Sequence, residues 1–542
     1  MCTTEARGTA VYRTGHLTAA PTPQGAQKAR RPALALLLLI FAACGDSPRE
    51  ARSGPPNILF VVWDTARADR MSLYGHDQPT TPRLDAWARE ALVFDDVVSA
   101  ASYTVPSHAS MFTGLLPSEH CATGEMATLH DDYKTLAELL REAGYATFLY
   151  AENPHLTEQQ RISQGFSQHE HPWSPRYLER ARAILKQKLD GDDTSELGDR
   201  LAEMERGERE LTPWNVKAAG ELAEDAVHDF IDATPANQPF FIFVNYMEAH
   251  RPYLPPRRYR ERFMSPDQLE ASYQVDRSWG TIWEYTFGQR DVAERDLALT
   301  RATYDATLRE LDDLFGSLID SLKQRGALRD TIVVLTSDHG EHLGEQHMFD
   351  HQSTLYEPAL RVPLVLSFPG RLDAGRRPDP VMNFDVFPTL LELAGVPIPD
   401  GQHVSARSLL SAAPDRERLA QEPATESSAV RAMRRLHPGW NPDAWVRSQQ
   451  ALYRGRYKWI APSHGDAELY DLDKDPAESR NLAALREIDA ATLRGALARV
   501  RSQLVPCNES AIPELGAEDR ALLEMLGYGS SDASDSQRSG SR

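Results

Sequence analysis

The stretch NILFVVWD, residues 57–64, is a continuous apolar run of strand length that ends on an acidic residue. An apolar run without alternation is typical of a strand that is buried on both faces of a sheet. Similar runs recur at 145–150, 239–246, 331–336 and 362–368, with helical patterns between them. Strands that alternate with helices form a mostly parallel sheet covered on both sides. We therefore expect an α/β fold, a three-layer sandwich around a mostly parallel central sheet.

Two of the intervening helical patterns are clear. Thr81 and Pro82 open the first with a cap and a proline in the first turn, and its apolar stripe runs on to Leu92. The second covers about 297–326 and carries one apolar face. Ligands of such sheets bind beyond the carboxyl ends of the strands. Residues that directly follow a strand are therefore the first candidates for a functional site.

The amino-terminal residues resemble a bacterial lipoprotein signal. An apolar run at 33–43 follows three basic residues and ends directly before Cys44. The run is too short to span a bilayer, and its flanks are typical of a secretory signal. We expect residues 1–44 to be a lipoprotein signal segment, with a lipid on Cys44 that tethers an exported protein to the membrane, in the periplasm or at the outer membrane. The alternative is a plain signal peptide with an incidental cysteine, and the protein is exported in either case.

Charge and cysteine content limit the partners and the compartment. The chain has 59 basic and 79 acidic residues and a formal net charge of -20, which repels nucleic acid. We therefore expect no nucleic-acid binding. Beyond the signal segment only Cys121 and Cys507 remain. They could form a disulfide in an oxidising compartment or stay as buried thiols.

Composition divides the rest of the chain. A polar linker covers 45–56, and the main α/β domain should span 57–420. A highly charged, helix-prone insertion interrupts this domain near 174–212. Short β-like patterns late in the chain predict a smaller C-terminal α+β subdomain over 421–528. The polar residues 529–542 should form a disordered tail.

Ligand-type residues follow two of the expected strands directly. Asp64 comes after the strand at 57–63, and Asp338-His339 comes after the strand at 331–336. Parallel strands bring their carboxyl ends to one edge of the sheet, so these side chains should lie close together. Two carboxylates and an imidazole suit Ca²⁺, Mn²⁺ or Zn²⁺. Asp64 alone could be a helix cap, but with Asp338 and His339 it predicts a site for one divalent metal ion.

A third candidate, Thr104, stands at the expected start of a helix. In the sequence TVPSH the proline two residues after Thr104 suits the first turn of a helix. Free backbone N–H groups and the helix dipole favour an anion at such a start. Thr104 could therefore hold or attack a phosphate or sulfate group, or it could serve only as the helix cap.

Six motifs, in order, resemble those of the sulfatase family within the alkaline-phosphatase superfamily, over nearly the whole chain after the signal segment. The motifs are DTARADRMSLYG from Asp64, TVPSHASMFTGLLPSEH from Thr104, NYMEAHRPYLPP around His250, SDHGEHLGEQHMFDH from Ser337, YEPALRVPL from Tyr356 and ELYDLDKDPAESRNL from Glu468. The resemblance implies an alkaline-phosphatase-like fold and a metal-dependent hydrolase of sulfate or phosphate esters.

The resemblance also implies roles for individual residues. The residues that would bind the metal are Asp64, Thr104, Asp338 and His339. Thr104 occupies the position of the nucleophile, and His108 takes the place of the arginine that follows Pro-Ser in standard sulfatases. His250 and His351 correspond to groups that hold the ester's oxygens or protonate the leaving group. Each of the three catalytic-site histidines could instead be a buried structural residue.

The sequence departs from standard sulfatases at the nucleophile. Those enzymes have a cysteine or serine that is oxidised to formylglycine, and Thr104 cannot undergo this conversion, so we expect no formylglycine. A metal-activated threonine resembles the nucleotide pyrophosphatases and lipoteichoic acid synthases of the same superfamily, which handle phosphoryl groups. The metal set departs as well, because His339 shifts the preference from Ca²⁺ toward Mn²⁺ or Zn²⁺.

These residues predict in-line attack by Thr104 on the phosphorus or sulfur atom of a small molecule, glycan or lipid ester, with His108, His250 and His351 offsetting negative charge. Two alternatives remain open. The protein could be a phosphotransferase that hands the Thr104-bound group to an envelope glycan or lipid. It could also be a catalytically silent binding homologue that kept the pocket after threonine replaced the usual nucleophile.

Overall fold

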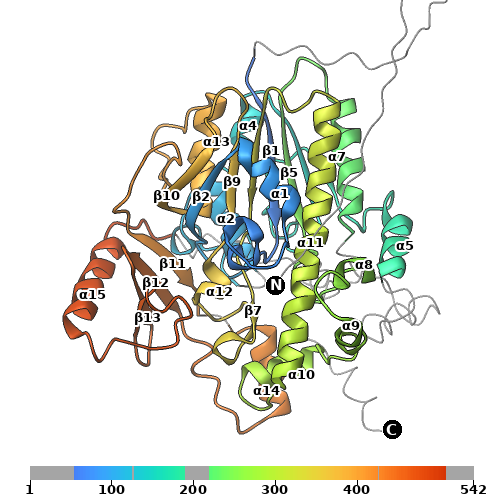
Figure 1. Cartoon of the computed structure of the whole chain (residues 1–542). Coiled ribbons are helices and arrows are strands. Elements are labelled where there is room, and N and C mark those ends of the chain that lie inside the picture. Colours follow the sequence, from blue (N-terminus) through green and yellow to red (C-terminus); the bar gives the residue numbers. More distant parts are fainter. Residues whose placement is uncertain (1–53, 125–126, 189–218, 425, 508–542) are drawn as a thin grey trace, which may run out of the picture. The chain divides into compact units, whose positions relative to one another are not determined.

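A computed structural model describes residues 54–124, 127–188, 219–424 and 426–507 (Figure 1). Its main feature is an eight-stranded sheet with the strand order β10-β2-β9-β6-β1-β5-β3-β4. The strands are β1 (Asn57–Trp63), β2 (Leu92–Val98), β3 (Ala146–Ala151), β4 (Gln168–Glu170), β5 (Phe240–Tyr246), β6 (Thr331–Thr336), β9 (Leu364–Ser367) and β10 (Gly375–Met382). All five runs that the sequence marked as strands are strands of this sheet.

The strand β1 lies inside the sheet, and all of its residues are buried, as its apolar sequence predicted. It pairs in parallel with β5 on one side and with β6 on the other. The carboxyl ends of these three strands therefore meet at one edge. The strand β9 runs antiparallel to both of its neighbours, β6 and β2, while the other strand pairs are parallel. The prediction of a mostly parallel sheet is confirmed.

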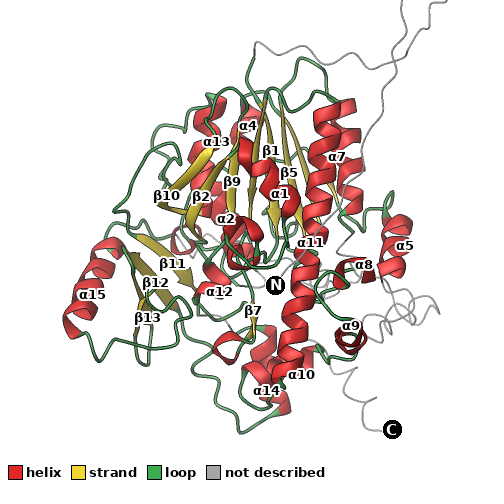
Figure 2. Cartoon of the chain, in the orientation of Figure 1, coloured by secondary structure: helices red, strands yellow, loops and turns green. Residues whose placement is uncertain are grey.

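Helices cover both faces of the sheet (Figure 2). Alternate β1 side chains enter two separate cores, Ile58, Phe60 and Val62 on one face and Leu59, Val61 and Trp63 on the other. The first core includes α2 (Thr104–Thr113), α4 (Leu136–Glu142) and α13 (Val386–Ala394), and the second includes α1 (Pro82–Trp87), α7 (Glu221–Ala233) and α11 (Glu294–Gln324). This arrangement is the predicted three-layer sandwich.

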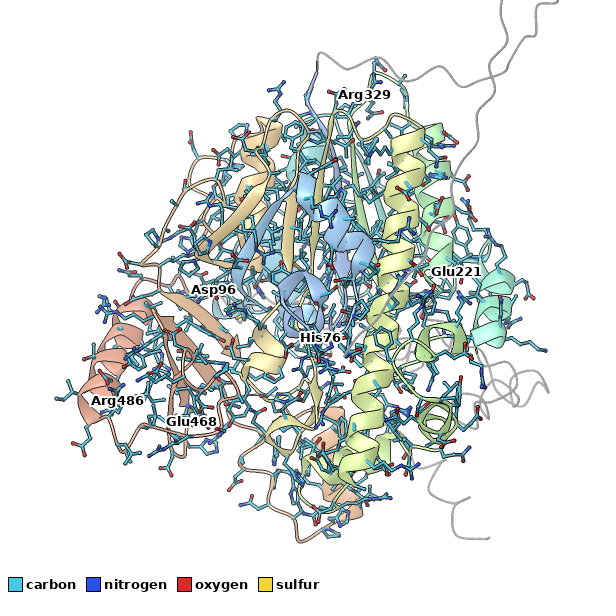
Figure 3. All side chains as sticks on the ribbon, in the orientation of Figure 1. His76, Asp96, Glu221, Arg329, Glu468 and Arg486 are labelled. Atoms are coloured by element: carbon cyan, nitrogen blue, oxygen red, sulfur yellow. A yellow bond between two sulfur atoms is a disulfide. The ribbon has the colours of Figure 1, made fainter. Side chains whose placement is uncertain are left out.

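The sequence misplaced the end of the first helix. The helix α1 ends at Trp87, a 3-10 turn covers Ala88–Glu90, and Leu92 begins β2. This strand was not predicted, because Asp95 and Asp96 interrupt its apolar pattern. Asp96, labelled in Figure 3, instead forms ion pairs with arginines from other segments.

A smaller antiparallel sheet follows, as expected of the C-terminal α+β subdomain. Its strands are β11 (Arg418–Glu422), β12 (Gln449–Arg454), β13 (Tyr457–Pro462) and β14 (Glu468–Asp471), and the helix α15 (Glu487–Arg501) packs against β12 and β13. The helix α14 (Ser428–Leu436), which follows β11 in the chain, packs instead against α10 (Trp279–Thr286). The strand β11 begins three residues before the expected boundary at 421. Arg418 on β11 pairs with Asp96 on β2, with nitrogen and oxygen 2.7 Å apart, and this contact ties the two sheets together.

The remaining elements are short. They are α3 (Pro117–His120), α5 (Leu178–Lys188), α8 (Arg257–Arg260), α9 (Pro266–Ser272), α10 (Trp279–Thr286), α12 (Glu357–Leu360), β7 (His342–Leu343) and β8 (Phe349–Asp350). The helix α5 belongs to the predicted insertion, and the rest of that insertion, from 189 to 212, lies outside the described residues. The predicted signal segment, the linker up to residue 53 and the tail also lie outside them.

Cys121, which follows α3, forms a disulfide with Cys507. The sequence had left open whether these cysteines form a disulfide or stay as buried thiols. No helix in the described part of the chain has the length and apolar character needed to cross a membrane.

Candidate active site

The residues expected to bind a metal converge at the edge of the sheet where β1 and β6 end. Asp64 follows β1 directly, and Asp338 and His339 follow β6 after a single serine. Thr104, the first residue of α2, lies beside them. All four residues are at most 1% exposed. The parallel register of β1 and β6 is what brings Asp64 and Asp338 together.

The Asp64 carboxylate is held from one side only. Its Oδ2 accepts hydrogen bonds from Nδ2 of Asn153 at 2.7 Å and from Nδ2 of Asn245 at 3.1 Å. Its Oδ1 is buried and has no hydrogen-bond partner among the described residues. Burial, together with repulsion from Asp338, raises the pKa of Asp64 to about 7. A buried carboxylate oxygen without a donor favours a cation in that position.

The Asp338 carboxylate is arranged in the same way. Its Oδ1 accepts the backbone N–H groups of Thr65 at 3.1 Å and of His339 at 2.9 Å. Thr65 reaches it from a left-handed backbone conformation with φ of 58°. The other oxygen, Oδ2, also lacks a hydrogen-bond partner in the described residues and lies 3.3 Å from Nε2 of His339. Burial raises the pKa of Asp338 to about 7.

The His339 ring is fixed in one tautomer. Its Nδ1 lies 2.9 Å from the carbonyl oxygen of Gly340, which can only accept, so Nδ1 carries the proton and Nε2 keeps its lone pair. Burial lowers the pKa of His339 to about 3, so the ring is neutral. Gly340 is required here, because a Cβ would lie 2.1 Å from the carbonyl oxygen of Pro358. A neutral imidazole with an oriented Nε2 is a metal ligand.

Thr104 completes this set. Its Oγ1 lies 3.4 Å from Nε2 of His339 and accepts a hydrogen bond of 3.4 Å from Nδ2 of Asn153. Ligand atoms of Asp64, Asp338 and His339 lie within 4.8 Å of one another. Two carboxylate oxygens without donors, a neutral imidazole and a hydroxyl therefore face one point, and this donor set fits a divalent cation.

His108, which takes the place of an arginine in standard sulfatases, lies beside the Thr104 backbone. Its Nδ1 donates to the carbonyl oxygen of Thr104 at 2.9 Å, and the ring packs edge-on against Phe112 and Phe243. The hydrogen bond to Thr104 favours a protonated ring, but burial outweighs it and lowers the pKa of His108 to about 3. The ring is therefore neutral at pH 7. The role of His108 in offsetting negative charge during the reaction stays a prediction, because it requires a proton on a ring whose burial among aromatic side chains disfavours protonation.

His250 and His351 lie together beside the first group. The centroid of the His351 ring is 5.3 Å from that of His250 and 4.3 Å from that of His339. Nδ1 of His351 lies 2.8 Å from Asp350 Oδ1 and 3.2 Å from Glu341 Oε2. Burial opposes protonation, but the two carboxylates outweigh it and raise the pKa of His351 to about 10. In the absence of a bound cation, the positive charge of the site is therefore on His351.

A model of the sulfatase family matches residues 56–396, well over half of the chain. The chain belongs to the sulfatase family. A second model, that of the C-terminal region of N-sulphoglucosamine sulphohydrolase, matches residues 344–503. Membership makes the protein an ester hydrolase of the sulfatase type, and sulfatases are a metal-dependent family.

Individual relatives of this sulfatase-family protein span most of its length. An N-acetylglucosamine-6-O-sulfatase of Bacteroides thetaiotaomicron is 26% identical over 83% of the chain and 86% of its own length. A choline-sulfatase of Rhizobium meliloti is 25% identical, over 81% of the chain and 85% of its own length. The crystal structure of a phosphonate monoester hydrolase of Agrobacterium radiobacter has the same fold, with a TM-score of 0.65 and 23% identity over 83% of the chain and 96% of the other.

Several residues of this sulfatase-family site were missed by reasoning from the sequence. Asn153 follows β3 and could have been found by the same strand-end rule that found Asp64. Asn245 lies inside an apolar strand, where a polar residue is itself a signal. Glu341 and Asp350 lie within a quoted motif but were given no role. Both carboxylates contact Nδ1 of His351. These contacts depend on the fold of the loop between β6 and His351, which the sequence pattern does not reveal.

Proposed function

We propose that this protein hydrolyses a sulfate or phosphate ester by in-line attack of Thr104, with a divalent metal ion held by Asp64, Thr104, Asp338 and His339. One observation carries the proposal. The Thr104 hydroxyl lies 3.4 Å from His339 Nε2, where Asp64 and Asp338 each present a buried oxygen without a hydrogen-bond donor in the described residues. A nucleophile beside such a ligand set fits metal-assisted hydrolysis.

The metal would be Mn²⁺, Zn²⁺ or Ca²⁺, with the His339 nitrogen favouring the first two. When bound, it would act as a Lewis acid that lowers the pKa of the Thr104 hydroxyl and offsets charge on a non-bridging oxygen of the ester. The chain contributes the rest of the arrangement. Asn153 and Asn245 fix the Asp64 carboxylate, and the contact between His339 and Gly340 fixes the imidazole.

The chain's own residues account for the two bond changes. The Thr104 hydroxyl loses its proton to solvent, and Oγ1 forms a bond to phosphorus or sulfur as the bond to the leaving oxygen breaks. Positive charge at His250 and His351 stabilises the leaving oxygen until it gains a proton from solvent. Water then attacks the phosphorus or sulfur atom, the bond to Oγ1 breaks, Oγ1 regains a proton, and the phosphate or sulfate group is released. Because the helix α2 begins at Thr104, its free backbone N–H groups also favour an anion there.

The substrate we propose is a sulfated or phosphorylated small molecule, glycan or lipid. Two relatives are named as an N-acetylglucosamine-6-O-sulfatase and a choline-sulfatase, and a structural relative is named as a phosphonate monoester hydrolase. A threonine cannot supply formylglycine, so a phosphate ester is at least as suitable a substrate here as a sulfate ester.

We also propose that the protein is exported and tethered to the membrane by a lipid on Cys44. The basic and apolar segments before Cys44 support this proposal. The disulfide between Cys121 and Cys507 supports it as well, because disulfides persist in oxidising compartments outside the cytoplasm.

A substrate panel tests the proposed activity. Nitrophenyl sulfate, nitrophenyl phosphate and bis-nitrophenyl phosphate are offered to the protein after chelation and after reloading with Mn²⁺ or Zn²⁺. We expect at least one ester to be hydrolysed by the reloaded protein and none by the chelated protein. If the reloaded protein hydrolyses none of them but binds their anions, it is a silent binding homologue. If added alcohol acceptors take up the released group, the protein is a phosphotransferase.

Metal binding should strengthen as the pH rises toward 7. Burial raises the pKa of both Asp64 and Asp338 to about 7 in the metal-free chain, so below that pH a cation must displace protons. We expect the apparent Kd for Mn²⁺ to fall by about tenfold between pH 6 and pH 7, as measured by competition with a chromogenic chelator.

The same pKa shifts predict how stability depends on pH. Because the folded pKa values of Asp64 and Asp338 lie above the unfolded ones, these two carboxylates destabilise the metal-free protein increasingly as the pH rises from about 4 to about 7. Added metal should therefore raise the Tm more at pH 7 than at pH 5. An apparent Kd for Mn²⁺ that is the same at pH 6 and at pH 7 would contradict the assignment of Asp64 and Asp338 as ligands.

A further inference from the structure

The helix α15 has two apolar sides. One side, which includes Leu493 and Leu497, is buried, and the helix packs against β12 and β13 (Figure 1). The other side carries four exposed residues spaced by three, four and three positions, which are Ile488, Ala491, Gly495 and Ala498. This spacing places them in one stripe along the helix. A surface helix normally has polar residues on its outer side, so a second apolar stripe indicates that another segment covers it.

The exposed large apolar side chains of this protein gather around the stripe. Four such side chains are exposed in the described part of the chain, and three of them lie on α15 or within four residues of its ends. They are Leu485, Ile488 and Val505, with exposed fractions of 65%, 83% and 51%. A Cβ added to Gly495 would meet no described atom within 4 Å. The stripe is therefore a continuous open surface, which is typical of a contact site.

The sequence beyond the last described residue contains a matching pattern. In the stretch PELGAEDRALLEMLG from Pro513, Leu515 is followed seven residues later by Leu522, and Met525 and Leu526 lie three and four residues further on. Apolar residues at these spacings are typical of an amphipathic helix, and the glycine that closes the stretch is typical of a helix end. Large side chains on one helix fit between the small residues of another.

The charges of this stretch and of the carboxyl-terminal half of α15 are complementary. Arg494 lies over the Trp459 ring, and Arg501 donates a hydrogen bond to Gln450. Neither arginine has a carboxylate partner among the described residues. Residues 514–524 contain four acidic residues and one arginine. Opposite charges around an apolar contact favour the correct partner and fix its position.

The chain is long enough to reach the stripe. Cys507 lies six residues beyond the end of α15 and is held by its disulfide with Cys121. Residues 508–514 can span about 25 Å, whereas the stripe from Ile488 to Ala498 is about 15 Å long. A stripe of that length is short for two separate proteins, whose stable interfaces bury about 1,200–2,000 Å². A segment of the same chain needs less area, because its effective concentration is high.

We propose that the exposed stripe of α15 is the docking surface for residues 513–527 of the same chain. In the docked state Leu522, Met525 and Leu526 cover the stripe, and acidic side chains of the segment lie beside Arg494. The docked segment also prevents the stripes of two protein copies from associating. This surface is separate from the residues of the candidate active site, so the inference does not depend on the proposed hydrolase activity.

The reactivity of a cysteine in the stripe tests the proposal in the full-length protein. Ile488→Cys is treated with a maleimide, and labelling of the peptide that contains position 488 is followed by mass spectrometry. We expect labelling about tenfold slower than in Ala444→Cys, which replaces an exposed residue in the loop before β12, because a covered thiol reacts only when the segment opens. Adding Leu522→Glu and Leu526→Glu should restore fast labelling. Adding Leu523→Glu, which lies off the apolar stripe of the segment, should not.

Two results would overturn the proposal. Labelling of Ile488→Cys as fast as that of Ala444→Cys would show that the stripe is open. Slow labelling that persists with Leu522→Glu and Leu526→Glu would show that something else covers it, and size-exclusion chromatography would tell whether this is a second copy of the chain. Circular dichroism identifies any variant that has not folded. If Ile488→Cys does not fold, Ala491→Cys provides the same measurement.

Discussion

Replacing Thr104 with alanine should lower kcat/KM by about 10⁴-fold or more, because the change removes the atom that we propose forms the bond to phosphorus or sulfur. The fold should survive, since among the described residues the Thr104 hydroxyl makes two long hydrogen bonds of 3.4 Å, with His339 and Asn153. Zinc or manganese should still bind through Asp64, Asp338 and His339. Steady-state kinetics on the best ester of the substrate panel, with metal content measured on the same sample, gives the result.

Two control variants make this result specific. Thr104→Ser keeps the hydroxyl and should retain measurable turnover. Thr113→Ala removes an equally buried hydroxyl at the other end of α2, where it donates to the Ala109 carbonyl oxygen, and should leave turnover close to that of the unaltered protein. A fully active Thr104→Ala protein on all three nitrophenyl esters would remove Thr104 from the mechanism.

Replacing Asp338 with asparagine should release the metal from the first site and lower kcat/KM by about 10³-fold or more. An asparagine can keep its oxygen on the backbone N–H groups of Thr65 and His339, which then places its NH₂ group where Asp338 Oδ2 now lies. An N–H donor repels a cation, and one negative charge is lost. Elemental analysis should show the loss of metal and kinetics the loss of turnover.

Asp312→Asn is the matched control for this change. Asp312 is also fully buried and also accepts two backbone N–H groups, those of Arg83 and Leu84, but it lies on α11, outside the site. We expect this variant to keep its metal and its activity even if its Tm falls. Unchanged metal content in Asp338→Asn would show that the ion binds elsewhere.

Much of the fold could be predicted because the central strands are uniformly apolar. The run at 57–63 indicated a strand buried on both faces, and the alternation of such runs with helical patterns indicated a sheet covered by helices on both sides. The strands β2 and β10 escaped notice because they lie toward an edge of the sheet and carry charged residues such as Asp96 and Arg376, whose partners come from distant segments. A single sequence contains no signal for such pairs.

The metal ligands Asp64, Asp338 and His339 were also predictable, since all three follow central strands. The charge states of His108 and His351 could not be predicted in this way. Burial among aromatic rings decides that His108 is neutral, and the contact with Asp350 and Glu341 decides that His351 attracts positive charge. Both effects depend on tertiary neighbours, which the spacing of residues along the chain does not contain.

A covalent ester on Thr104 is the most direct test of the account. The metal-loaded protein is mixed with its best nitrophenyl ester, quenched in acid within the first turnovers, digested and analysed by mass spectrometry. We predict a phosphoryl or sulfuryl group on the peptide that contains Thr104, absent from the chelated protein and from Thr104→Ala. Steady hydrolysis with no modified Thr104 peptide at any quench time, or the group on another residue, would contradict Thr104 as the nucleophile.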